Sequence, residues 1–343
     1  MRLRDSATAV RLESALPHLL GGLRVRDWAE RTVFELLRRA GQSSPPARFS
    51  DELLRARKVT RVTYDTAAPP IWGRLLIRND GFEISLSPVH GDREPWRRFA
   101  LAHEISHTLL YDITTWPPRA LTHYEAGNRD LEWLCGYVAK CLLVPGPWLL
   151  QISKAYPQAG FPGFSFAVLS QLERDFRVPW PLVAERLVEH LGLWDCVVLR
   201  FAASDRSPAS LHGGATCEWR LNWHTVPDEL RDVLFIPVGR REPTGMRFPR
   251  TRGILTRFIE SSIAGHSNDS YFQTTVRPVT FNVSTTGNLG KFLAKSFRAG
   301  EVPVYGFVHR PAEGSLFDRP ETNSPALYVA LCIPLAGRPN VTT

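Results

Sequence analysis

Apolar side chains recur three to four positions apart over much of residues 7–57, which is the period of an amphipathic helix. The positions that set this pattern are Val10, Leu12, Leu16, Leu19, Val33, Leu36 and Leu37. The segment GQSSPPARFS interrupts the pattern with residues that favour turns. The sequence therefore predicts a helical start to the chain, with a break between two of its helices at this segment.

The pattern then changes to that of strands. KVTRVTYDT and IWGRLLIRNDGFEISLS are rich in β-branched and aliphatic residues, and NDG is typical of a hairpin turn. Helical spacing returns in WRRFALAHEISHTLL and again in LEWLCGYVAKCLLVP, where Pro145 ends the helix. We expect residues 1–150 to form a small domain of helices with a short sheet.

Residues 151–195 contain a third kind of pattern. FAVLSQLERDFRVPWPLVAERLVEHLGL predicts two short helices with a tight connection at Val178–Pro181, which resembles a helix-turn-helix. The second helix, however, carries Glu185 and Glu189 beside Arg186, and carboxylates in that position repel DNA phosphates. We therefore predict that these helices serve packing and do not read DNA.

From Cys196 onward the chain is predicted to be mostly strands. CEWRLNW alternates between apolar and polar residues, as a half-buried strand does. Further strands are expected at VLFIPV, VTFNVST, VPVYGFVHR and LYVALCIPLA, with one helix at GILTRFIESSIAG. Residues 196–343 thus form a separate α+β domain, and the whole chain is predicted to be of the α+β class.

Composition adds limits to this picture. The net charge is +8, but only five of the 42 basic residues are lysine, and the basic residues are scattered without a dense run. We therefore predict no nucleic-acid face. No run approaches the ~18 apolar residues of a membrane span, and the N-terminus has no clean apolar segment of a secretory signal. The five cysteines form no C-x-x-C motif and no disulfide framework, which fits a reducing cytoplasm.

The motif that carries chemistry is H-E-x-x-H at His103, Glu104 and His107. Residues four apart on a helix lie on the same face, so the two imidazoles can converge on one metal ion. Glu104 lies one step around the helix, where it can take a proton from a water bound to the metal. The apolar residues Leu101, Ala102, Ile105 and Leu109 around the motif predict that the helix lies in a core. Burying these polar groups there is costly unless something pairs with them.

A catalytic zinc site needs a third protein ligand and an open fourth position. The metzincin spacing fails, because Leu110 and Ile113 stand where that class has glycine and histidine. The acidic and histidine candidates downstream are Asp112, His123, Glu125, Asp130 and Glu132. Glu132 is best placed, since it begins an amphipathic helix on which Gly136 and Ala139 allow a close approach to the metal helix. His123 and Glu125 lie in a loop with proline and glycine that suits a lid.

These residues resemble the ImmA/IrrE-type metallopeptidases of bacteria and their mobile elements. The resemblance lies in RRFALAHEISHTLL and in EWLCGYVAKCLLVP, within about residues 75–150, and GFEISLS looks like the family's edge strand. It implies a zincin-like fold, His103, His107 and Glu132 as ligands of zinc (manganese is also accepted), and Glu104 as the base. Cys135, Gly136 and Val138 depart from the family's alanine, asparagine and phenylalanine, and Tyr111 replaces a frequent histidine.

The resemblance also implies a function. The expectation is a cytoplasmic zinc endopeptidase that cleaves a protein, namely a helix-turn-helix repressor, with the substrate chain extended beside the strand before the metal helix. The C-terminal domain would then be a GAF-like sensor. Tyr111 and His123 are candidates to orient ligands or to donate to an oxyanion, with packing as the simple alternative for Tyr111.

A second interpretation is a regulator without peptidase activity whose metal site is structural. Such a site is closed by a fourth protein ligand, for which the sequence offers His123 or Cys135. A third interpretation is a small-molecule sensor in which the C-terminal domain does the main work. The sequence sets no oligomeric state.

Overall fold

The chain forms two compact units, 1–157 with 167–186, and 158–166 with 187–343. The computed structural model describes residues 3–64, 73–87, 94–122, 128–155, 166–193, 196–203, 219–225, 246–247, 272–273, 305–310 and 326–332. The described segments contain both helices and strands in separate stretches, so the predicted α+β class is confirmed. The boundaries differ from the predicted 1–150, 151–195 and 196–343. Helix α7 (Gly146–Ala155) runs across residue 150, and the contact division falls after Arg186.

Four helices precede the first strand, as the apolar spacing predicts. They are α1 (Leu3–Ala15), α2 (Pro17–Leu20), α3 (Val25–Arg39) and α4 (Asp51–Ala56). The predicted break lies between α3 and α4, and the Ser50 side chain caps α4 by accepting from the backbone N–H of Leu53 at 3.4 Å. Val10 is an exception to the predicted core, because its side chain is 61% exposed. Leu12 of α1 is buried instead, as is Leu16, which lies between α1 and α2.

A three-stranded sheet follows the helices. It comprises β1 (Val59–Tyr64), β2 (Gly73–Ile77) and β3 (Phe82–Leu86) in the order β1-β3-β2. The predicted hairpin at NDG is confirmed: β2 and β3 are antiparallel, and the turn is closed by a bond from Arg78 N to Gly81 O of 2.9 Å.

The strand GFEISLS is not an edge strand, contrary to the expectation from the family resemblance. It forms β3, which pairs with β1 in parallel and with β2 in antiparallel orientation. Both backbone edges of β3 are therefore occupied, and the two edges of the described sheet are β1 and β2. A substrate strand has no place beside β3.

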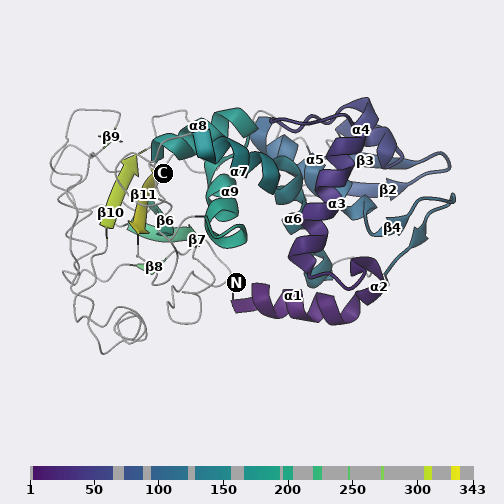
Figure 1. The fold of residues 1–343 in the computed structure, drawn as a ribbon, viewed down its shortest axis with the longest axis horizontal. Coiled ribbons are helices and arrows are strands. Elements are labelled where there is room, and N and C mark those ends of the chain that lie inside the picture. Colours follow the sequence, from purple (N-terminus) through teal and green to yellow (C-terminus); the bar gives the residue numbers. More distant parts are fainter. Residues whose placement is uncertain are drawn as a thin grey trace. The chain divides into compact units, whose positions relative to one another are not determined.

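Two helices that pack against each other form the centre of the first unit. They are α5 (Glu94–Thr108), which also packs on β2 and β3, and α6 (Arg129–Leu143), which also packs on α3. Figure 1 shows these helices beside the small sheet. In the sequence, the short strands β4 (Tyr111–Asp112) and β5 (Arg119–Ala120) come between these two helices, and they pair with each other.

The segment that resembles a helix-turn-helix forms α8 (Phe166–Phe176) and α9 (Trp180–Glu185), and α9 continues into the π-helix η2 (Arg186–His190). The connection is residues 177–179, slightly earlier than predicted, because Trp180 and Pro181 already belong to the first turn of α9. Its turn passes through Arg177, whose φ of 52° lies in the left-handed region.

The charged residues Glu185, Arg186 and Glu189 in the second half of this segment are buried, which agrees with the predicted packing role. Arg186 bonds to the Glu30 carboxylate of α3 and, at 3.0 Å, to the backbone oxygen of Val144. Glu185 forms an ion pair with Lys140 of α6. Arg186 and Glu185 are therefore paired inside the protein, whereas the charged side chains of a recognition helix face DNA.

Among its described residues, the second unit contains a six-stranded antiparallel sheet of order β8-β7-β6-β11-β10-β9. Its strands are β6 (Cys196–Ala203), β7 (Trp219–Thr225), β8 (Met246–Arg247), β9 (Phe272–Gln273), β10 (Tyr305–Arg310) and β11 (Ala326–Cys332). The predicted strands at CEWRLNW, VPVYGFVHR and LYVALCIPLA are confirmed where they are described. VLFIPV, VTFNVST and the helix GILTRFIESSIAG lie outside the described residues.

Among the residues that the structure describes, one helical stretch, Arg129–Ile152, is long and apolar enough to cross a membrane by length and composition, contrary to the expectation from the sequence. It comprises α6 and most of α7, and 72% of its apolar window is buried inside the protein. Such burial is also what the core helix of a folded unit shows.

The buried Arg186 yields a prediction for stability. Replacing Arg186 by Ala leaves the Glu30 carboxylate and the Val144 carbonyl without this guanidinium, and we expect the free energy of unfolding to fall by about 3 kcal/mol. Arg39→Ala is the matched control, because Arg39 pairs with Glu35 on the exposed surface of α3 and its loss costs under about 1 kcal/mol. Urea unfolding followed by circular dichroism measures both. Equal effects would show that the buried network contributes no more than a surface pair.

Candidate metal centre

The end of α5 that carries the histidines is anchored from outside the helix. The guanidinium of Arg57 donates to the hydroxyl of Thr108 at 3.1 Å, to the Thr108 backbone oxygen, and to the Tyr111 backbone oxygen at 3.3 Å. These contacts satisfy carbonyl groups that a helix C-terminus leaves without partners. The last turn of α5, which contains His107, is thereby held in place.

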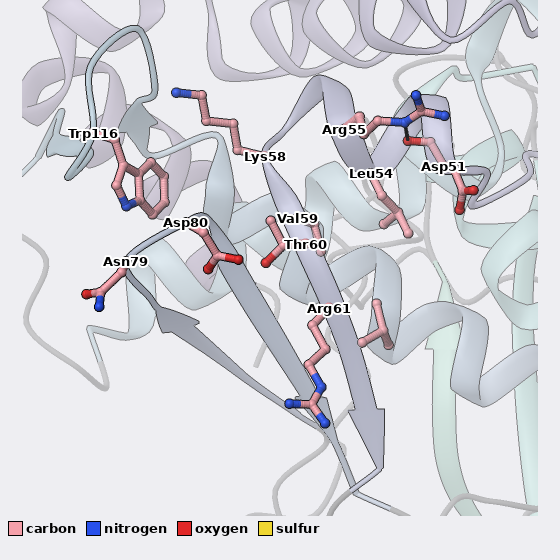
Figure 2. Close-up of a pocket in the computed structure, with 11 residues that line it drawn as sticks. Asp51, Leu54, Arg55, Lys58, Val59, Thr60, Arg61, Asn79, Asp80 and Trp116 are labelled. Carbon is pink, nitrogen blue, oxygen red and sulfur yellow. Dashed lines mark hydrogen bonds between the residues drawn. The ribbon is translucent and has the colours of Figure 1, made fainter.

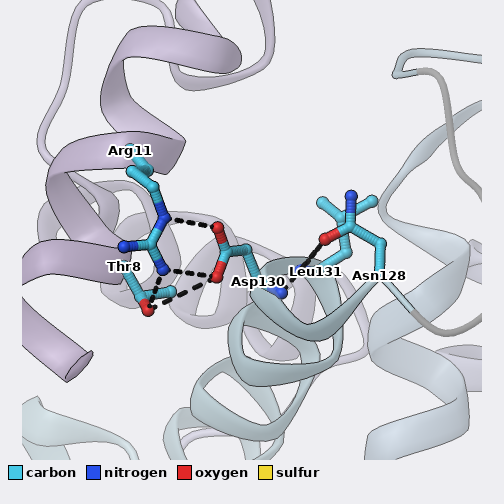
Figure 3. A network of polar contacts seen from close by, with 5 residues as sticks. All are labelled: Thr8, Arg11, Asn128, Asp130 and Leu131. Atoms are coloured by element: carbon cyan, nitrogen blue, oxygen red, sulfur yellow. Dashed lines mark hydrogen bonds and ion pairs between the residues drawn. The ribbon is translucent and has the colours of Figure 1, made fainter.

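The start of α6 is fixed by a second set of contacts (Figure 3). The side-chain oxygen of Asn128 accepts from the backbone N–H groups of Asp130 at 3.1 Å and Leu131 at 3.4 Å, which is an N-cap. The Asp130 carboxylate forms two bonds with Arg11 of α1, at 2.7 and 2.8 Å. Because the cap and the Arg11 bonds hold the first turn of α6, they also fix the position of Glu132 in that turn.

Three predicted ligand atoms meet between the two helices. His103 Nε2 lies 3.1 Å from Glu132 Oε2 and 3.2 Å from His107 Nε2, and His107 Nε2 lies 3.7 Å from Glu132 Oε2. Two atoms that each bind a tetrahedral zinc ion at about 2.0–2.1 Å are roughly 3.3 Å apart. The spacing and the chemistry of this donor set therefore fit one such ion, and His103, His107 and Glu132 are the residues that can hold it.

The other candidates for a third ligand do not join this group among the described residues. Asp112 accepts from the backbone N–H and the hydroxyl of Thr114, at 2.9 and 2.7 Å. Asp130 pairs with Arg11. His123 and Glu125 lie outside the described residues.

Glu104 is buried beside the three ligand residues, with only 4% of its surface exposed. Burial raises the pKa of Glu104 to about 7; His103 opposes this shift and the Glu132 carboxylate adds to it. A carboxylate with a pKa near neutrality can both accept and return a proton at physiological pH. The predicted base therefore lies in an environment suited to proton transfer.

The strand β2 closes one side of the Glu104 side chain. A Cβ atom on Gly73 would lie 2.8 Å from Glu104 Cγ and 2.9 Å from Glu104 Oε1, which is closer than side chains approach each other. Only glycine leaves room here for the carboxylate. Gly136 differs from its predicted role, because a Cβ there meets no described atom within 4 Å. Close packing of α6 on α5 therefore does not depend on Gly136.

Cys135 contacts the opposite side of the His107 ring. Its sulfur lies 3.4 Å from His107 Nδ1, whereas Nε2 of the same ring faces the other ligands. Burial raises the pKa of the Cys135 thiol well above its ordinary value. Cys135 thus sits behind a ligand and not beside the donor atoms, where a fourth ligand of a closed structural site would have to be.

Tyr111 follows α5 and is half-buried. Its ring packs on Phe82 of β3, with centroids 5.5 Å apart, and burial raises the pKa of its hydroxyl. The packing role considered for Tyr111 is therefore present. A role of its hydroxyl toward an oxyanion stays a prediction.

A cavity of about 830 Å³ lies along β1, the edge of the sheet opposite β2 (Figure 2). Charged side chains such as Arg61 and Asp80 line it, and Lys58 lies over the ring of Trp116 at 5.5 Å. It contains none of the three ligand residues. The cavity is therefore distinct from the metal centre.

The sequence patterns did not indicate two residues that shape the site, Gly73 and Arg57. Gly73 has no local signal, because its contact with Glu104 arises only when β2 pairs in the sheet. Arg57 likewise has no local signal, because its partners Thr108 and Tyr111 lie more than 50 residues further along the chain. Cys135 lies three positions after Glu132, so helical spacing places both on one face, and that spacing is the signal for its proximity to the site.

Comparisons with known proteins add little. No protein-family model matches the chain, and no curated protein matches it significantly. A solved structure of a Mycobacterium tuberculosis transcriptional regulator is similar with a TM-score of 0.41 and 14% identity, over 90% of this chain and 79% of that one. At this level of similarity the match carries no conclusion about function.

The two glycines make a matched pair for a test of packing. We expect Gly73→Ala to lower the free energy of unfolding by about 1–3 kcal/mol, since the new methyl group displaces Glu104. Gly136→Ala should raise it by up to about 1 kcal/mol, because alanine favours a helix and meets no described atom. Urea unfolding measures both changes. If Gly73→Ala is as well tolerated as Gly136→Ala, β2 does not confine Glu104.

Proposed function

We propose that this protein is a zinc-dependent endopeptidase with a zincin-like catalytic unit. The observation that carries the proposal is the triangle of His103, His107 and Glu132 donor atoms, 3.1–3.7 Å apart, with the buried carboxylate of Glu104 on the same helix. Three protein ligands leave a tetrahedral ion one position for substrate or water. Two further features support a catalytic site over a structural one: the Glu132 side chain is 40% exposed, and the Cys135 sulfur contacts His107 at Nδ1, not at the Nε2 that faces the other donor atoms.

In the proposed reaction Glu104 moves the protons. Zinc, when bound, supplies Lewis-acid polarisation of the scissile carbonyl and makes water a stronger nucleophile at neutral pH. Glu104 removes a proton from the attacking water as its oxygen bonds to the carbonyl carbon. The same carboxyl group then delivers that proton to the amide nitrogen as the C–N bond breaks. Confinement by Gly73 keeps Glu104 oriented for both transfers.

The substrate chain is proposed to lie along β2. This strand is an edge of the described sheet, and its first residue, Gly73, contacts Glu104. An extended peptide paired with such an edge gains main-chain hydrogen bonds independent of its sequence. The arrangement replaces the expected position beside β3, whose two edges are both paired.

The proposed substrate is a DNA-binding repressor of the helix-turn-helix type, and the proposed role of the second unit is to sense a signal and gate cleavage. Support for the substrate and for the sensor comes from the resemblance to ImmA/IrrE-type peptidases. The proposal places the reaction in the cytoplasm, where such repressors act.

Metal binding tests the centre itself. We expect the purified chain to bind one zinc ion, and His103→Ala, His107→Ala or Glu132→Ala each to abolish stoichiometric binding, because each removes a third of the donor set. Asp112→Ala is a matched control, since this carboxylate accepts from Thr114 and is not one of the three converging donors. Metal analysis after dialysis measures the content. Undiminished zinc in all three variants would exclude this centre.

Proteolysis tests the role of Glu104. Glu104→Gln is expected to keep zinc and to lose activity by at least about 100-fold, because an amide cannot accept the proton. Glu94→Gln changes an exposed acid in the first turn of the same helix and should leave activity unchanged. Cleavage of a purified helix-turn-helix repressor mixed with the protein and zinc, followed by mass spectrometry, is the measurement. Unchanged proteolysis in Glu104→Gln would rule this mechanism out.

The alternative hypothesis, a regulator without peptidase activity, predicts a different result. It would show salt-sensitive binding to duplex DNA that survives His103→Ala, and no cleavage by the unaltered protein.

A further inference from the structure

Cys135 is held against a ligand histidine without belonging to the ligand set. Its sulfur is 3.4 Å from His107 Nδ1, and the residue is 1% exposed. His107 Nε2, on the other side of the ring, faces His103 Nε2 at 3.2 Å. One imidazole therefore connects the thiol to the three donor atoms.

The chemistry of imidazole gives this contact a direction. A histidine that binds a metal through Nε2 carries its remaining proton on Nδ1, and that N–H needs an acceptor. Ligand histidines usually donate this proton to a carboxylate, a backbone carbonyl or a water, and the acceptor fixes both tautomer and ring orientation. A thiol sulfur is a weak acceptor, and α6 places the sulfur of Cys135 within 3.4 Å of Nδ1.

We propose that Cys135 is a positioning residue of the metal centre: its sulfur accepts the hydrogen bond from His107 Nδ1–H, and so keeps Nε2 unprotonated and directed at the metal. This inference rests on the proposed metal centre. It assigns to Cys135 a role separate from metal ligation and from covalent catalysis.

The position of Cys135 on α6 supports the role. Cys135 follows Glu132 by three residues, so one helix face carries both a ligand and the acceptor behind another ligand. The N-cap at Asn128 and the bonds between Arg11 and Asp130 hold the turn before it. Whatever aligns Glu132 with His103 therefore also aligns the thiol with His107.

A second buried cysteine on the same helix offers a matched control. Cys141 is fully buried, and its sulfur contacts the Glu30 carboxylate at 3.6 Å, away from the three ligands. Truncating either cysteine removes one buried sulfur from α6. Only truncation of Cys135 removes an acceptor from His107, so a general packing effect and a positioning effect give different patterns.

The experiment measures zinc affinity of the full chain by competition with a chromophoric chelator under reducing conditions. We expect Cys135→Ala and Cys135→Val to weaken binding roughly tenfold, the low end of the range for loss of such a partner, because sulfur accepts weakly. Cys135→Ser should restore most of the affinity, since its hydroxyl can accept. Cys141→Ala should bind zinc as the unaltered protein does. Valine fills the space of the thiol, so it covers the case in which the alanine variant does not fold.

Thermal unfolding of the metal-free proteins and the visible spectrum of the cobalt-substituted ones complete the test. A lower melting temperature without a change in affinity or in the cobalt spectrum assigns Cys135 to packing and overturns the inference. So does a serine variant as weak as the valine variant. An unaltered protein that binds no zinc overturns the proposed function and this inference together, whereas normal binding in Cys135→Val overturns the inference alone.

Discussion

The convergence of three electron-rich side chains between α5 and α6 is the constraint on which the first unit depends. Two imidazole nitrogens, of His103 and His107, and a carboxylate oxygen of Glu132 lie 3.1–3.7 Å apart. His107 is buried. Electron-rich atoms this close together repel one another, which is costly unless a cation or a proton is shared among them. The helices must therefore be held in position by contacts outside the site. Arg57 does this at the end of α5, and Asn128 with the Arg11–Asp130 pair does it at the start of α6.

The two carboxylates of the site differ because their surroundings differ. Glu104 is enclosed by α5 and β2, and burial raises its pKa to about 7. Glu132 begins a helix near solvent, and its side chain is 40% exposed. An exposed carboxylate is open to a cation, whereas an enclosed one whose pKa burial has raised can hold and release a proton near neutral pH. Two glutamates thus differ in what they can do, because one is buried and the other is partly exposed.

Local patterns predicted those parts of the structure that depend on nearest neighbours in the chain. Helical spacing located α5 and α6, the NDG turn located the hairpin, and H-E-x-x-H indicated two candidate ligands and a candidate base. For the third ligand, periodicity left five candidates, and Glu132 was favoured for its place at a helix start. The reasons against Asp112 and Asp130 became visible only in their partners, Thr114 and Arg11. Strand order was likewise beyond local reasoning: a parallel partner such as β1 is joined to β3 by no turn that a pattern could mark.

The segment that resembles a helix-turn-helix shows why spacing alone does not establish DNA binding. Its pattern of apolar residues predicted two helices correctly, but the same pattern arises whenever short helices pack on a core. The charged residues decide between these cases by their partners. Arg186 bonds to Glu30 and to the Val144 carbonyl, and Glu185 pairs with Lys140, so both lie in the interior of the first unit. Glu189, one turn later, accepts from the Thr225 hydroxyl at 2.7 Å within the second unit. Each of these three charges therefore meets a partner inside its own unit, which leaves none of them to bind DNA phosphates.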